Sequence, residues 1–337
     1  MSNIEVVGLG ALNIDTIYKV ERILGDGETI VNREQVERIL GDEETAVNRT
    51  GTFPGGSAAN TIYGLARLGV STGFAGVVGD DSEGKILVND FQRAGVDASR
   101  IRVKPGARSG SALCFSDKLN FRSIHITPGA NSLLNIDDID LDYINQAEIL
   151  HVSSFVDDTQ FEVLLELVDR LHPSVNISFS PGALYATKGL KALTPILKRT
   201  HVLLLNENEI QQMTGKDVSA GAESCLEQGS HIIVVTLGKG ASYKTVMATS
   251  YIRDAKNEYV VKPNNQNIIS DLDTIGAGDA FATGFLYGLL KEKSLEECGR
   301  LGNIVAQFSI AKIGARQGLP TPDELAQRYR QLYNKQL

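Results

Sequence analysis

The chain has 337 residues, of which 42% are hydrophobic and 22% are charged, and its formal net charge is −8. These proportions are those of a globular protein and exclude a disordered or collagenous chain. The negative charge argues against broad binding to nucleic acid or anionic lipid, since both need a positive surface field. The longest apolar runs, such as 232–235, are only as long as strands, so we expect no membrane span. The N-terminus lacks a secretory pattern, which predicts a cytoplasmic location.

Strands and helices alternate along the chain. A buried strand is expected over 4–10, where the apolar run ends in glycines. Further strands are predicted at 73–78, 112–115, 149–152, 175–179, 201–206 and 231–237, with helices over 58–68 and 160–171. This alternation favours parallel strands, right-handed crossovers and ligand sites at the carboxyl ends of the strands. The pattern therefore predicts an α/β fold with a doubly wound, mostly parallel sheet.

One segment near the N-terminus is repeated. Residues 20–34 recur as 36–50, and only two positions differ between 20–33 and 36–49. Two copies are too few for a solenoid, so we interpret the repeat as a local tandem duplication. Each copy carries a Gly-Asp turn signal between short β-compatible segments, which indicates a β flap or a loop that extends from one.

The strongest chemical signal lies at 273–281, DTIGAGDAF, just before a helical pattern at 282–290. Glycines in front of a helix leave its first N–H groups available, so Gly276, Ala277 and Gly278 are predicted to form an anion hole. Asp279 follows them, where its carboxylate can take a proton from a hydroxyl that attacks a bound phosphate. The alternative is a glycine turn in which Asp279 is an ordinary helix cap.

A second motif, FPGGSAAN at 53–60, precedes the first in the chain. Together, in this order and separation, the two resemble the signatures of the ribokinase (PfkB) family of carbohydrate kinases. The resemblance implies a ribokinase-like α/β/α sandwich with a small β lid, hinged at Gly55 and Gly56. It also implies that Asn60 binds the substrate. Without the resemblance, this segment is a turn before a helix that Ser57 caps.

The resemblance extends to other segments that bind the two substrates. Asn13 and Asp15 lie where the family has residues that hydrogen-bond sugar hydroxyls, although a plain turn is the alternative. On the nucleotide side, the matching positions are Asn206, Glu209, Thr236, Gly238, Gly240 and Asn303. The resemblance implies ATP as phosphoryl donor and Mg²⁺ held near Glu209 through water. Asp273 lies where many relatives bind a monovalent cation such as K⁺.

The chain divides unequally in this interpretation. Residues 1–14 and 62–337 form the main domain, and residues 15–61 form the lid and hinge segment that contains the duplication. Further lid strands are expected from about 105–127. The spacing from Asp15 to Gly55 is about one repeat unit too long for the family, so we expect the extra residues to enlarge the lid without affecting the catalytic centre. Relatives often pair through the lid, which predicts a homodimer.

The acceptor is less defined than the reaction. We expect a kinase that phosphorylates a hydroxymethyl group on a small sugar, like ribokinase or fructokinase. A nucleoside kinase of the same family is the first alternative, and a catalytically inactive sugar- or nucleotide-binding regulator is the second. A sugar-phosphate acceptor would need an arginine such as Arg108 or Arg122. Ribokinases carry an acidic substrate contact where this chain has Ser153 and Ser154.

Overall fold

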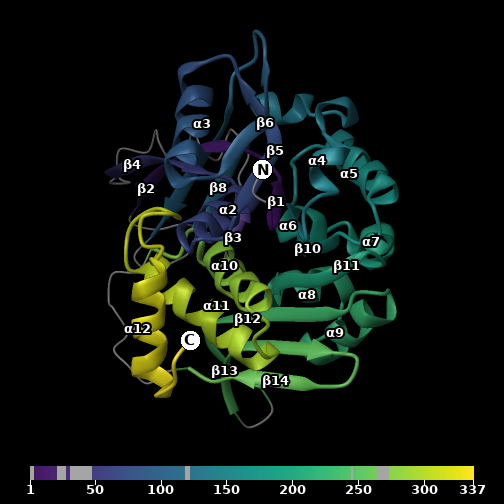
Figure 1. Ribbon diagram of the computed structural model, residues 1–337, viewed down its shortest axis with the longest axis vertical. Helices are drawn as coiled ribbons and strands as arrows, with labels where there is room; N and C mark the ends of the chain where they lie inside the picture. The colour runs from purple at the N-terminus through teal and green to yellow at the C-terminus, as the bar shows by residue number, and fades with distance from the viewer. Residues whose placement is uncertain (1–3, 21–27, 31–47, 118–121, 244–245, 264–272) are drawn as a thin grey trace.

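Two β-sheets organise the protein (Figure 1). The computed structural model describes residues 4–20, 28–30, 48–117, 122–243, 246–263 and 273–337. Within these residues, the larger sheet has nine strands. In spatial order they are β14 (Glu258–Val261), β13 (Val246–Asp254), β12 (Ile232–Tyr243), β11 (Thr200–Asn206), β10 (Asn176–Ser180), β9 (Ile149–Ser153), β1 (Val6–Leu9), β5 (Thr72–Gly79) and β6 (Asp97–Lys104).

The larger sheet is parallel from β12 to β6, and β13 pairs antiparallel with both of its neighbours, β12 and β14. Strand β1 lies inside the sheet between β9 and β5. All four of its residues are buried, as expected for a parallel strand that is covered on both faces. The predicted mostly parallel, doubly wound sheet is therefore confirmed.

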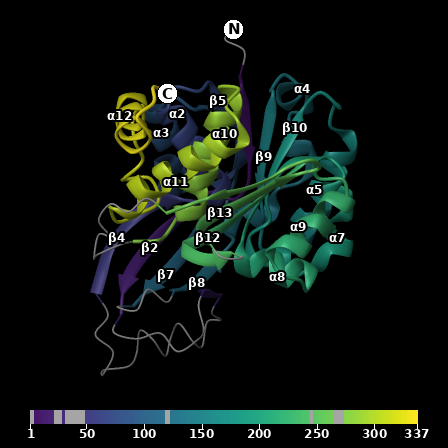
Figure 2. The same cartoon turned by 90° about the horizontal axis from the view of Figure 1, so that it is seen from below.

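Helices cover both faces of this sheet (Figure 2). One layer contains α2 (Ser57–Arg67), α3 (Ser82–Ala94), α10 (Ala277–Leu290), α11 (Leu295–Ile310) and α12 (Pro322–Tyr333). The other contains α4 (Leu141–Ile144), α5 (Asp158–Arg170), α6 (Gly182–Ala186), α7 (Gly189–Leu197), α8 (Glu207–Thr214) and α9 (Val218–Glu227), with the 3₁₀ turns η1 (Gly129–Leu133) and η2 (Ile136–Asp138) nearby in the chain. Among the described residues, no helix combines the length and apolar character needed to cross a bilayer.

Alternation along the strands supplies a core on each face. Val7 and Leu9 belong to the cluster under α5, α7, α8 and α9, whereas Val6 belongs to the cluster under α2 and α3. Gly8 allows α2 to approach closely, because a Cβ atom there would lie 2.4 Å from Ile62 Cγ1. The glycine therefore fixes the position of α2 on the sheet.

The smaller sheet, which we call the lid, extends from one edge of the sandwich (Figure 2). Its described strands, in spatial order, are β3 (Glu28–Ile30), β8 (Arg122–Thr127), β7 (Gly110–Ser116), β2 (Asn13–Lys19) and β4 (Asn48–Gly55). The strand predicted at 112–115 is β7. Most of the duplication at 20–34 and 36–50 falls outside the described residues, which here include only 20, 28–30 and 48–50.

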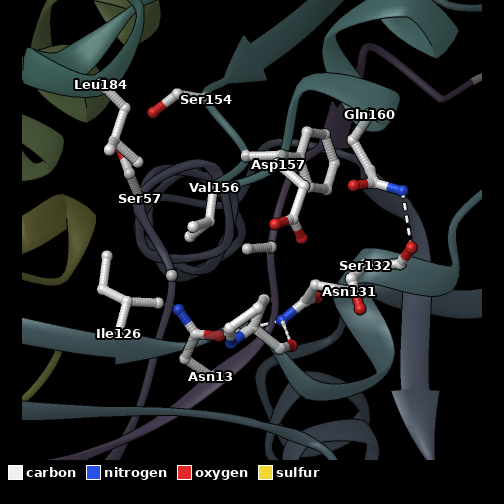
Figure 3. Close-up of a pocket in the computed structure, with 14 residues that line it drawn as sticks. Asn13, Ser57, Ile126, Asn131, Ser132, Ser154, Val156, Asp157, Gln160 and Leu184 are labelled. Carbon is white, nitrogen blue, oxygen red and sulfur yellow. Dashed lines mark hydrogen bonds between the residues drawn. The ribbon is translucent and has the colours of Figure 1, made fainter. Parts of the chain in front are cut away.

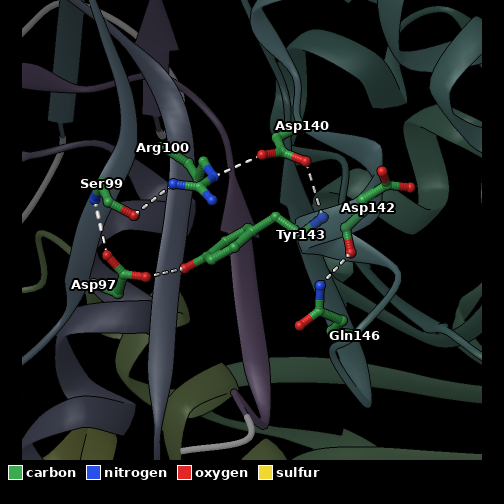
Figure 4. A network of polar contacts seen from close by, with 7 residues as sticks. All are labelled: Asp97, Ser99, Arg100, Asp140, Asp142, Tyr143 and Gln146. Carbon is green, nitrogen blue, oxygen red and sulfur yellow. Dashed lines mark hydrogen bonds and ion pairs between the residues drawn. The ribbon is translucent and has the colours of Figure 1, made fainter. Parts of the chain in front are cut away.

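A polar network secures the far edge of the larger sheet (Figure 4). The Tyr143 hydroxyl of α4 donates to Asp97 Oδ2 of β6 at 2.8 Å, and Arg100 Nε pairs with Asp140 Oδ2 at 2.8 Å. The Arg100 guanidinium also lies over the Tyr143 ring, 4.8 Å from its centroid. Burial raises the pKa of Tyr143 above its usual range. These contacts connect the edge strand β6 to α4.

Candidate active site

Asp279 lies where the N-termini of two helices meet. It is the third residue of α10, which begins at Ala277 behind the N-cap residue Gly276. Gly276 has φ 74°, and a Cβ atom there would lie 2.4 Å from Ala315 Cβ, so only glycine suits this position. The helix begins five residues earlier than the pattern at 282–290 predicts, because the glycine-rich segment forms its first turn.

The Asp279 carboxylate receives hydrogen bonds from the facing helix α2. Ser57 Oγ donates to Oδ1 at 2.7 Å, and Asn60 Nδ2 donates to Oδ2 at 2.8 Å. The N-cap residue of α10 is Gly276, so Asp279, the third residue of the helix, does not occupy the capping position. Two neutral donors stabilise the ionised carboxylate and fix its direction.

The predicted anion-hole residues differ in their surroundings. The N–H group of Ala277 donates to the Thr274 carbonyl at 3.2 Å. Gly278 is exposed, with open space where a side chain would be. The first turn of α10 therefore presents backbone rather than side chains to the solvent beside Asp279.

The diglycine meets two close neighbours. A Cβ atom on Gly55 would lie 2.0 Å from Asp15 Oδ2, and one on Gly56, which has φ 102°, would lie 2.0 Å from the Ala11 carbonyl oxygen. Gly55 pairs with Asn13 across the antiparallel strands β4 and β2. Any larger side chain would displace the start of β2 from the start of α2.

Asp15 is a half-buried acid in strand β2. Burial raises its pKa to about 7, the positive charge of Arg316 counteracts this rise, and the negative charge of Asp279 adds to it. The two carboxylates are therefore electrostatically coupled. The charge of Asp279 disfavours ionisation of Asp15.

Arg316 connects these groups, and no sequence motif indicated this role. It is 5% exposed. Its guanidinium donates from Nε to Asn60 Oδ1 at 2.9 Å, from Nη1 to Asp90 Oδ2 at 2.6 Å and from Nη2 to the Gly55 carbonyl at 3.2 Å. Burial lowers the pKa of Arg316, while Asp90 and Asp15 oppose that shift. Asn60, predicted to bind substrate, thus accepts from Arg316 and donates to Asp279.

A pocket lies next to this cluster (Figure 3). It has a volume of about 120 Å³, and Asn13, Gly56 and Ser57 line one part of it. Asn131, which the sequence did not indicate, also lines it and donates from Nδ2 to Asn13 Oδ1 at 3.0 Å. Asp279 itself is not among the lining residues, but Ser57 both lines the pocket and donates to Asp279, so one side chain connects the pocket to the carboxylate.

The predicted nucleotide-side residues lie at the carboxyl end of β11, in the first turn of α8, along β12 and on α11. Asn206 and Glu209 form a reciprocal capping box at the start of α8, so Glu209 Oε2 accepts from the Asn206 N–H at 2.9 Å. Thr236 pairs with Asn206 in the sheet. Gly238 and Gly240 have φ values of 57° and 111°, within a register shift between β12 and β13.

Two further predicted residues are engaged by the protein itself. Asn303 is 9% exposed and donates from Nδ2 to Thr249 Oγ1 at 2.7 Å. Asp273 Oδ1 accepts from the Ile275 N–H at 3.0 Å, and its Oδ2 accepts from the Gly314 N–H at 2.8 Å. The Asp273 side chain therefore joins the segment before α10 to the loop after α11.

Comparison of the sequence with known protein families identifies the family of this chain. A profile of the pfkB family carbohydrate kinases matches residues 4–322. The chain belongs to this pfkB family. As a pfkB family kinase, it is a phosphotransferase with an alcohol group as acceptor.

Relatives in sequence carry kinase names. The chain is 40% identical over 257 residues to an uncharacterized sugar kinase of Archaeoglobus fulgidus, a match that covers 76% of this chain and 98% of the relative. It is 27% identical over 323 residues to ribokinase of Haemophilus influenzae, with 94% and 95% of the two chains covered. Both matches span most of each protein.

Solved structures show the same fold. Adenosine kinase from Sinorhizobium meliloti superposes with a TM-score of 0.82 at 22% identity, covering 98% of this chain and 99% of that one. Ribokinase from Thermotoga maritima gives a TM-score of 0.75 at 23% identity, with 96% and 98% covered. The ribokinase-like architecture with a lid is therefore confirmed, and the fold is common to kinases of different acceptors.

Proposed function

We propose that this pfkB family kinase transfers the γ-phosphoryl group of ATP to a hydroxymethyl group of a small sugar, with Asp279 as general base. One observation carries the proposal. The Asp279 carboxylate is held by Ser57 and Asn60 at the meeting point of two helix N-termini, next to a pocket that Ser57 also lines. A hydroxyl bound in this pocket would lie beside a fixed proton acceptor.

In the proposed mechanism, the substrate occupies the pocket between the sheet and the lid. Asn13 and Asp15 hold its hydroxyls, and Gly55 and Gly56 let the lid close over it, which excludes water. Asp279 accepts the proton of the attacking hydroxyl. Backbone N–H groups at the start of α10 donate hydrogen bonds to the transferring phosphoryl group and so stabilise the negative charge on its oxygens. The N-terminal end of the helix dipole adds to this stabilisation.

The nucleotide is proposed to lie along Thr236, Gly238 and Gly240, with Asn303 beside it. When bound, Mg²⁺ would neutralise charge on the phosphate oxygens. Glu209 fits the outer shell of such an ion, where a carboxylate contacts the metal through water. Its Oε2 accepts from the Asn206 N–H, which fixes the carboxylate at the start of α8. A monovalent cation near Asp273 stays a prediction. Both carboxylate oxygens of Asp273 accept hydrogen bonds from backbone N–H groups.

Alternative acceptors follow from the relatives and the pocket. Apolar residues including Ile126, Phe155 and Leu184 line the pocket as well, and the fold is also that of an adenosine kinase, which keeps a nucleoside acceptor as the second candidate. Arg108 is exposed and does not line the pocket, and the side chain of Arg122 lies outside the described residues. A sugar-phosphate acceptor thus has no described arginine to support it.

We also propose a homodimer that pairs through the lid. Strand β4 is the terminal described strand of the smaller sheet, and such an edge can pair with a second copy. Light scattering coupled to gel filtration measures this, and a monomer at all concentrations tested would exclude it. A cytoplasmic location is proposed on the ground that a sugar kinase needs access to ATP.

The substitution Asp279→Asn tests the proposed base. We expect kcat to fall by at least about 10²–10⁴-fold, the range for loss of a general base, while nucleotide binding is retained. Asp217→Asn is a matched control, because Asp217 is also a carboxylate at a helix start, where it accepts from the Ala220 N–H at 3.0 Å. Near-normal turnover in Asp279→Asn would refute the assignment. An absence of ADP production with every sugar and nucleoside, despite tight binding, would instead favour an inactive regulator.

A further inference from the structure

One wall of the pocket carries two hydrogen-bond acceptors that the protein does not use. Asp157 Oδ2 and Gln160 Oε1 are both buried, and neither has a hydrogen-bond partner in the part of the chain that the structure describes. Both residues line the pocket. Figure 3 shows the Asp157 carboxylate pointing into the space between Asn13 and Gln160. Buried acceptors are almost always paired in proteins, so these two require an explanation.

The carboxamide of Gln160 is fixed in one orientation. Its side chain is 1% exposed, and Nε2 donates to the Ser132 carbonyl at 2.7 Å and to the Leu134 carbonyl at 3.2 Å. Because both of these partners are acceptors, the nitrogen must face them, which leaves the oxygen on the other side of the carboxamide, toward Asp157 in Figure 3. The unpaired acceptor of Gln160 therefore lies in the wall of the pocket, next to that of Asp157.

Asp157 occupies a position where aspartate usually serves the helix. It is the N-cap residue of α5, yet its side chain makes no capping hydrogen bond. By contrast, the N-cap residues Asp81, Asp140 and Asp217 each accept from a backbone N–H of their helix. The Asp157 carboxylate thus gives up a stabilising contact and is directed to the pocket instead.

The charge of this wall is not compensated within the pocket. None of the described lining residues is lysine or arginine. The next residue, Asp158, does have a cation, because its carboxylate pairs with Lys188. An anionic group on a ligand would therefore meet the negative charge of Asp157 at short range without a balancing cation.

We propose that Asp157 and Gln160 form the distal end of the substrate site and select a neutral, polyhydroxylated sugar against acidic sugars and sugar phosphates. This rests on the proposed sugar kinase function. Hydroxyl groups supply the donors that both acceptors lack, and a hydrogen bond to a carboxylate is among the stronger ones. The pocket volume of about 120 Å³ lies well below the ~300–1,000 Å³ of sites for larger ligands, which favours a sugar over a nucleoside.

The test compares substrate charge and residue charge together. The purified full-length protein is assayed for ADP release with ATP and Mg²⁺ on ribose, fructose, gluconate, 2-dehydro-3-deoxygluconate, fructose 6-phosphate, adenosine and inosine. We expect kcat/KM to be at least about 10²-fold higher for a neutral sugar than for the acidic or phosphorylated compounds, because the Asp157 carboxylate repels a negatively charged ligand in the same pocket. Higher kcat/KM for an acidic sugar or a nucleoside would overturn the inference.

The substitution Asp157→Asn keeps the shape and removes the charge. For the preferred neutral sugar, we expect KM to rise by about 10-fold with kcat within about 3-fold, because a contact remote from the reacting hydroxyl contributes uniform binding. For acidic sugars, we expect kcat/KM to rise by about 10-fold. Asp158→Asn makes the same change one residue later in the chain, at a side chain that faces Lys188, and should alter neither quantity.

Calorimetric titration of each sugar in the presence of a non-hydrolysable ATP analogue separates the two levels of proposal. If no compound yields ADP, the kinase proposal fails, while weaker sugar binding by Asp157→Asn than by Asp158→Asn would still support the subsite. If sugars are phosphorylated but Asp157→Asn binds them like the unaltered protein and discriminates equally against acids, the subsite is wrong and the kinase proposal stands.

Discussion

Replacing Asp15 by asparagine should make the protein more stable at neutral and alkaline pH, although it removes a proposed sugar contact. The Asp15 side chain is half-buried, and burial raises its pKa from 3.8 to about 7. Arg316 counteracts this rise and Asp279 adds to it. The folded protein therefore disfavours the ionised form that the unfolded chain adopts freely.

The sign and size of the effect follow from proton linkage. Between pH 3.8 and about pH 7, this carboxyl binds more protons in the folded than in the unfolded state, so the free energy of unfolding decreases as the pH rises through this window. The penalty is absent below pH 3.8 and complete above about pH 7. At 1.36 kcal/mol per pKa unit, its upper limit is about 4 kcal/mol. Because part of the side chain contacts solvent, we expect about 2 kcal/mol.

Urea unfolding of the unaltered protein and of Asp15→Asn, followed by circular dichroism at pH 5 and pH 8, measures this penalty. The stability difference in favour of the variant should widen by about 1–2 kcal/mol between the two pH values. A difference that stays constant with pH would show that Asp15 ionises normally in the folded protein. A variant less stable at pH 8 would show that attraction to Arg316 outweighs burial.

Three other substitutions or deletions test separate parts of the structure. Arg316→Lys keeps the charge but cannot make all three hydrogen bonds to Asn60, Asp90 and Gly55. We therefore expect the free energy of unfolding, measured with urea, to fall by about 2–4 kcal/mol and kcat, measured by ADP release, to decrease. Unchanged kinetics would show that Arg316 does not position Asn60 and Asp279. Tyr143→Phe should cost about 1–2 kcal/mol without any change in kinetics, because it removes only a donor at the far edge of the sheet. A variant that lacks residues 20–35 should fold and turn over substrate normally, and loss of turnover in a folded variant would show that the duplication contributes to catalysis.

Much of the fold follows from local patterns in the sequence. The buried strand Val6–Leu9 is a continuous apolar run, and α2 and α5 show apolar residues at helical spacing. These signals require no knowledge of distant residues. The end of β12 could not be predicted this way, because the strand continues past Gly238 and Gly240 to Tyr243 through an irregular pairing with β13.

The chemistry of the site depends on contacts that local patterns do not carry. Arg316 reaches Asn60 across 256 residues of sequence, and a local pattern cannot show so distant a partner. Asp157 looks like an ordinary helix cap, since aspartate is common at that position. Only the structure shows that its side chain makes no capping hydrogen bond and lines the pocket instead.

The loop after α11 joins the parts of the site that must act together. Ala315 packs against Gly276 at the start of α10, and Gly314 lies beside the ring of Phe53 in lid strand β4. Arg316 binds both the Gly55 carbonyl at the hinge and Asn60, the donor to Asp279. In the proposed mechanism, a hinge rotation that closes the lid would move the Gly55 carbonyl, and the same guanidinium would then shift against Asn60. The proposed base and the proposed hinge thus share one buried side chain, so the orientation of Asp279 should depend on whether the lid is closed.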